Sequence, residues 1–92
     1  MAFKKIRSIR LSYAKQGQIY FALLNYRTQP KRTQEKIDRL INAAAKGEQE
    51  YTQALRQWLL RGERWDKVTM EHYVHPSRLC QMRKHIYEHW DE

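Results

Sequence analysis

Apolar residues recur along most of this chain at the spacing of an α-helix, and no segment shows a convincing strand pattern. They fall at i, i+3, i+4 and i+7 from Ile37 to Ala44, and at i, i+4, i+7 and i+8 from Tyr51 to Leu59. Further helices are predicted over residues 12–28 and 65–73, and a stripe from Leu79 to Trp90 marks a last one. The pattern predicts an all-α protein.

Glycine and proline punctuate this pattern and place the ends of the predicted helices. Pro30 disfavours helix at the preceding residue, and Thr33 is the predicted N-cap of the next helix. Gly47 and Gly62 are expected to end the second and third helices. Pro76 suits the first position of the last helix. We therefore expect one compact bundle of four to five helices.

The C-terminal third, residues 62–92, has the apolar spacing of a helix–turn–helix. This motif needs a short support helix, a tight turn and a recognition helix held at a steep angle across it. The angle depends on buried apolar residues at offsets 0, +6, +11 and +14, which here are Val68, Val74, Leu79 and Met82. Thr69 stands where a small residue lets the two helices approach.

Positive charge is concentrated near the N-terminus. Residues 1–32 carry no acid and account for the whole formal charge of +8, whereas residues 33–92 sum to zero. This distribution indicates a polyanionic partner, most simply nucleic acid, although a solvated basic tail would have the same composition. Residues 1–11 are interpreted as a basic arm that can become ordered on binding, and residues 12–61 as a helical support and dimerisation region. The predicted phosphate or minor-groove contacts of the arm are Lys4, Lys5, Arg7 and Arg10.

The C-terminal region also resembles a known family. Residues 61–69 read RGERWDKVT, residues 70–79 read MEHYVHPSRL, and residues 83–86 read RKHI. These segments are similar to the entry, turn and recognition helix of the region-4-like domain of sigma factors. Together they resemble the ArpU/RinA-type phage transcriptional regulators of Gram-positive bacteria and their prophages. The chain departs from the family pattern at His72 and at His75-Pro76, which bears on base preference more than on fold.

The resemblance implies which residues read DNA. Residues near the start of the recognition helix face the major groove in such motifs; here they are His75, Ser77, Arg78 and Gln81, with Lys84 one turn on. Glutamine pairs bidentately with adenine and arginine with guanine. Arg83 is expected nearer a phosphate. The alternative interpretation is that all of these are ordinary solvated residues on an amphipathic helix.

The expected function is sequence-specific binding of double-stranded DNA, as a transcriptional regulator of a phage, prophage or mobile element. A short helix reads few base pairs, so we expect a homodimer, a higher homo-oligomer or a partner such as RNA polymerase. Two alternatives stay open. One is a DNA-packaging recognition subunit like a small terminase, and the other is a protein-interaction module or anti-repressor on the same fold.

Other classes of function find little support in the sequence. No phosphate-binding loop, paired carboxylates or nucleophile–histidine–acid set stands out, so we expect no enzyme and no cofactor. Histidines crowd around Cys80, but without a matched second pair of ligands we expect no metal. Trp58, Trp65 and Trp90 are interpreted as core residues. No apolar run suits a membrane span or signal peptide, and a cytoplasmic, DNA-associated protein in a bacterial host is expected.

Overall fold

The computed structural model describes residues 6–7 and 9–91 and confirms the all-α prediction. Five α-helices and no strand occur in this part of the chain, and their bounds are α1 Tyr13–Leu24, α2 Lys31–Ala45, α3 Gln49–Leu55, α4 Trp65–His72 and α5 Pro76–Glu88. A 3-10 turn, Tyr26–Thr28, follows α1, and a π-helical turn, Arg56–Leu60, continues α3.

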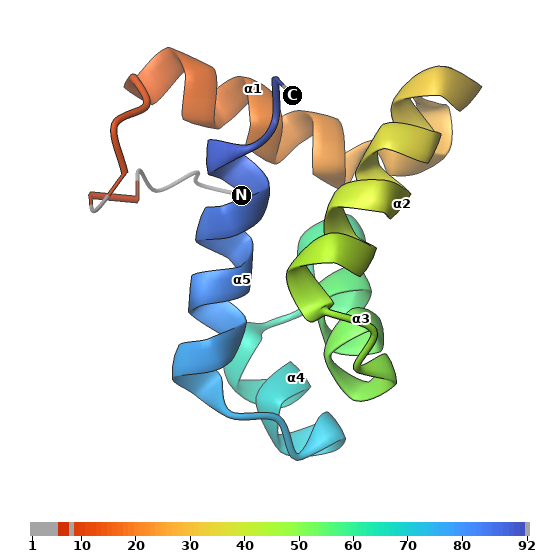
Figure 1. Cartoon of the computed structure of the whole chain (residues 1–92), viewed down its shortest axis with the longest axis vertical. Helices are drawn as coiled ribbons and strands as arrows, with labels where there is room; N and C mark the ends of the chain where they lie inside the picture. Colours follow the sequence, from red (N-terminus) through yellow and green to blue (C-terminus); the bar gives the residue numbers. More distant parts are fainter. Residues whose placement is uncertain (1–5, 8, 92) are drawn as a thin grey trace.

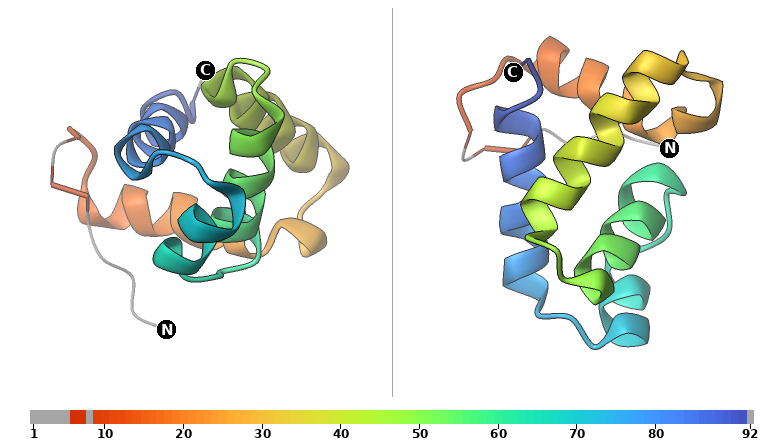
Figure 2. Two further views of the ribbon diagram at one scale, coloured as in Figure 1. Left: turned by 90° about the horizontal axis from the view of Figure 1, so that it is seen from below. Right: turned by 45° about the vertical axis from the view of Figure 1, so that its right-hand side comes forward.

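The helices form one rounded bundle (Figures 1 and 2). α2 and α5 lie side by side, α1 crosses one end of the molecule, and the short α4 lies at the opposite end with the turn that leads into α5. The radius of gyration is 12.3 Å. This is about the 12 Å expected for a compact domain of 92 residues.

The core lies where the apolar stripes of the helices meet. Ile37 and Ile41 of α2, Leu55 of α3, and Leu79 and Ile86 of α5 are all fully buried. Burial of each such side chain stabilises the fold by roughly 1.5–3 kcal/mol. Because α5 contributes to this core along its length, the helix predicted to read DNA is fixed to the rest of the molecule.

Local interactions explain the start of α1 and both ends of α2. The Ser12 hydroxyl accepts a hydrogen bond from the backbone N–H of Lys15 at 3.1 Å and so caps α1. The prediction of Thr33 as an N-cap is wrong, since α2 begins at Lys31 with the carbonyl of Pro30 accepting its first bond. The fixed φ of proline suits this junction. α2 ends as expected, in a left-handed turn at Lys46 and Gly47.

The N-terminal segment differs from the predicted basic arm. Ile6 and Ile9 are buried in the core, and the side chain of Gln16 is fully buried beside them. The Gln16 amide accepts a hydrogen bond from the N–H of Ile6 at 2.6 Å and donates to the carbonyls of Ile6 and Leu11. The described part of this segment is therefore docked on α1, with Arg7 exposed. Arg10 is exposed as well, while Lys4 and Lys5 lie outside the described residues.

Candidate nucleic-acid interface

The predicted helix–turn–helix is formed by α4, a short turn and α5. The four predicted contact residues all lie in the core: Val68, Val74, Leu79 and Met82. Thr69 is also buried, and its hydroxyl donates back to the carbonyl of Asp66 at 2.9 Å, which leaves no unpaired hydroxyl between the helices. The residues at the four apolar offsets are therefore buried, as the sequence predicts.

The turn between the helices holds a residue that sequence reasoning missed. Tyr73 adopts a left-handed conformation, with φ of 53°, and 95% of its side chain is exposed. Glycine is the usual residue in such a turn, because other side chains are strained there. The turn is tied to α3 by a hydrogen bond of 2.9 Å from the N–H of His75 to the Tyr51 hydroxyl. Tyr73 thus projects from a fixed position beside the start of α5.

One side of α5 is turned to solvent. Ser77, Gln81 and Lys84, at i, i+4 and i+7, occupy this side and are called the reading stripe below. Ser77 and Gln81 are exposed and Lys84 is half-buried. Glu88 continues the stripe in the last turn, where its carboxylate would repel a phosphate. The N-terminal half of α5 is therefore the part suited to approach DNA.

Two further predicted reading residues are engaged within the protein. The Arg78 guanidinium pairs with the carboxylate of Glu48 and lies 4.5 Å from the ring centre of Tyr51. The hydrogen bond to Glu48 raises the Arg78 pKa. The imidazole of His75 and the hydroxyl of Ser77 are 2.8 Å apart, within hydrogen-bonding distance. A contact between the Arg78 guanidinium and a base would therefore compete with Glu48.

Arg83 lies elsewhere than the sequence led us to expect. Its guanidinium packs over the ring of Trp58, 4.7 Å from the ring centre, and its Nε atom is buried without a hydrogen-bond partner. Burial lowers the Arg83 pKa. Position 83 is on the flank of α5 that faces α1 and the π-helical turn. Since each residue of a helix is rotated by about 100° from the one before it, Arg83 points about 100° away from Lys84 of the reading stripe. Arg83 is thus part of the packing of α5 rather than of its exposed side.

We predict that Arg83→Met leaves DNA binding intact. Methionine keeps an unbranched side chain over Trp58 and removes a largely buried charge, so the free energy of unfolding should change by less than about 1.5 kcal/mol. The slope of log K against log salt should also stay that of the parent. If Arg83 contacted a phosphate, its loss would flatten this slope by about 0.9. Titrations at several salt concentrations distinguish the two.

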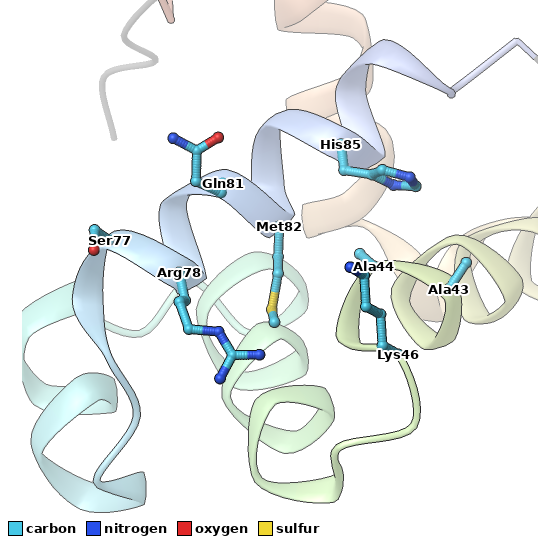
Figure 3. A pocket seen from close by; sticks show the side chains of 8 residues that line it. All are labelled: Ala43, Ala44, Lys46, Ser77, Arg78, Gln81, Met82 and His85. Atoms are coloured by element: carbon cyan, nitrogen blue, oxygen red, sulfur yellow. The ribbon is translucent and has the colours of Figure 1, made fainter.

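A groove separates the reading stripe from α2 (Figure 3). The C-terminal end of α2 lines it with Ala43, Ala44 and Lys46, and α5 lines it with Ser77, Arg78, Gln81, Met82 and His85. Its volume is about 380 Å³. Lys46 was not among the predicted site residues, because nothing in its local sequence shows that it lies beside α5.

The structure also shows where the tryptophans and histidines singled out in the sequence lie. Trp90 is buried and Trp58 is half-buried, but Trp65 is 38% exposed, so its assignment to the core is wrong. The rings of His85 and His89 stack with centres 4.2 Å apart. Within residues 6–7 and 9–91, no three His, Cys, Asp or Glu side chains are grouped to hold a metal ion.

No helix in the described part of the chain is both long and apolar enough to cross a membrane. No family model matches this sequence, and no curated protein or solved structure shows a significant similarity to it. The resemblance to phage regulators therefore stays a prediction that depends on residues 61–86.

Proposed function

We propose that this protein binds double-stranded DNA in a sequence-specific manner, with the N-terminal half of α5 in the major groove. The observation that carries the proposal is the reading stripe, in which Ser77 and Gln81 are exposed and Lys84 is half-buried, on a helix anchored in the core by Leu79 and Met82. A major groove about 12 Å wide admits one α-helix. The proposal therefore needs no rearrangement of the bundle.

The side chains of the reading stripe match the chemistry of base edges. The Gln81 amide can donate to and accept from adenine, and the Lys84 ammonium can donate to O6 and N7 of guanine. The Ser77 hydroxyl can pair with several bases. Arg78 would exchange the Glu48 carboxylate for guanine, and the Tyr73 hydroxyl can reach a phosphate at the edge of the groove.

The resemblance of residues 61–86 supports transcriptional regulation in a phage, prophage or mobile element as the biological role. One helix of 13 residues contacts only a few base pairs. A second copy of the chain, or a partner such as RNA polymerase, would extend the recognised site. The experiment that tests the proposal is selection of bound sequences from random duplex DNA, followed by measurement of the mass of the complex.

We predict that Gln81→Ala weakens binding to the selected site by roughly 1–3 kcal/mol, which is about 5–150-fold in affinity, and affects random DNA less. The matched control is Gln53→Ala, which removes an exposed glutamine on α3. Equal affinity of the parent and Gln81→Ala for the selected site would contradict the assignment of the reading stripe.

Two other outcomes would favour the alternative functions. A ring of eight or more subunits would favour a packaging subunit, and absence of duplex binding at low salt would favour a protein-interaction module.

A further inference from the structure

Three cations lie along one side of α2, and a fourth caps its C-terminal end. Arg32, Lys36 and Arg39 are four and three residues apart, a spacing that places them on one face of the helix. Lys46 follows Ala45 in the left-handed conformation. These four residues are called the basic stripe below. At a rise of 1.5 Å per residue the stripe is about 21 Å long. Arg32, Arg39 and Lys46 are exposed. The Lys36 ammonium lies 4.4 Å from the ring centre of Trp90.

None of these four cations forms an ion pair with a described carboxylate, in contrast to several other cations of the protein. Lys15, Arg56, Arg64, Lys67 and Arg78 each have an acidic partner. The acid at the centre of α2, Asp38, faces away from the stripe. Its carboxylate accepts hydrogen bonds from Arg56 at 2.8 Å and from the Tyr26 hydroxyl at 2.9 Å. Glu35, at the edge of the stripe, pairs with neither neighbouring arginine.

The basic stripe runs beside α5. Lys36 contacts Trp90, just beyond the C-terminal end of α5. Lys46 lines the groove at the other end of the stripe, together with Ser77 and Gln81 (Figure 3). α2 and α5 therefore lie side by side and run in opposite directions, as Figures 1 and 2 also show. The groove lies between the basic stripe and the reading stripe.

We propose that the basic stripe binds the phosphate backbone of one DNA strand at the rim of the major groove that α5 enters, with Lys46, beside Ser77 and Gln81, nearest the N-terminal half of α5 and Arg39 next along the stripe. The inference rests on the proposed function. Packed helices have axes about 8–10 Å apart, and the major groove is about 12 Å wide, so a helix beside α5 falls at the backbone rather than at the bases. Four cations without acidic partners meet the negative charge there. Such contacts position a protein on DNA without reading its sequence.

The test compares two double variants of the full chain. Arg39→Gln with Lys46→Gln removes the two charges of the basic stripe that lie nearest the N-terminal half of α5. Arg27→Gln with Arg61→Gln removes two exposed arginines elsewhere that also lack ion pairs with described acids, so the change in net charge is the same. Affinity is measured for the selected duplex and for a random duplex at salt concentrations from about 50 to 200 mM. Thermal melting verifies that both variants are folded.

The stripe variant should flatten the slope of log K against log salt by about 1.8, or 0.9 per contact. Across a fourfold rise in salt, its affinity should therefore fall about 12-fold less than that of the parent. The ratio of selected to random binding should stay the same, and the control should keep the parent slope. Equal flattening in both variants, or none in the stripe variant, would overturn the inference while leaving the proposed function intact. A parent that binds no duplex at low salt would overturn both.

Discussion

Leu79→Ala should lower the free energy of unfolding by about 2–5 kcal/mol, because it opens a cavity where α5 packs on the rest of the bundle. Leu79 is 0% exposed and is one of the four buried apolar residues at the predicted helix–turn–helix offsets. A domain of this size has about 5–14 kcal/mol of stability in total. The melting temperature should therefore fall by roughly 10–30 °C, measured by circular dichroism.

The control for Leu79→Ala is Met70→Ala, which truncates an apolar side chain of α4 that is 76% exposed. Exposed truncations change stability by only about 0.5 kcal/mol. At temperatures where Leu79→Ala is folded, its preference among DNA sequences should match that of the parent, since Leu79 has no exposed atoms to contact a base. A melting temperature equal to that of Met70→Ala would show that the packing of α5 does not depend on Leu79.

The helix–turn–helix could be predicted because its determinants are local. Val68, Val74, Leu79 and Met82 lie within 15 consecutive positions, and all four are buried where their spacing places them. The helices themselves follow from apolar periodicity, which states which face of each is buried. The end of α2 was likewise visible, because Gly47 tolerates the left-handed turn.

Contacts between distant residues were beyond the sequence. Arg83 reads as a surface cation, yet it packs over Trp58, which is 25 residues earlier in the chain. Gln16 reads as a polar residue on a weakly amphipathic helix, yet its amide satisfies the backbone of Ile6, ten residues away. A side chain with both polar and apolar parts can be buried or exposed, and only its tertiary partners decide which.

The charge of the folded surface could likewise not be predicted from the net charge of sequence segments. Residues 33–92 sum to zero, and the excess of positive charge in the sequence falls in residues 1–32. In the structure, five acids of this region pair with Arg56, Arg64, Lys67 and Arg78. The basic stripe is left without acidic partners as a result. Net charge over a segment therefore says little about the potential of a face, because ion pairs form between helices as well as within them.

Gln16→Ala should release the N-terminal segment from α1 and destabilise the protein by about 1–3 kcal/mol for the buried backbone groups of Ile6 and Leu11 that lose their partner. Partial exposure of Ile6 and Ile9 would add to this loss. The expected result is a melting temperature roughly 5–20 °C below that of the parent. Gln18→Ala is the matched control, because Gln18 is exposed two residues further along the same helix.

The same variant separates packing from charge in the N-terminal segment. Gln16→Ala removes no cation, so the slope of log K against log salt should stay that of the parent even though the segment is released. Arg7→Gln with Arg10→Gln removes two exposed cations and leaves Gln16 in place; if both arginines meet phosphates, it should flatten the slope by about 1.8 without changing the melting temperature. A melting temperature of Gln16→Ala equal to that of Gln18→Ala would show that these hydrogen bonds do not hold the segment. An unchanged slope for the arginine variant would show that Arg7 and Arg10 do not contact phosphates. Phosphate binding would then fall to other cations, of which the basic stripe is the group that lies beside α5.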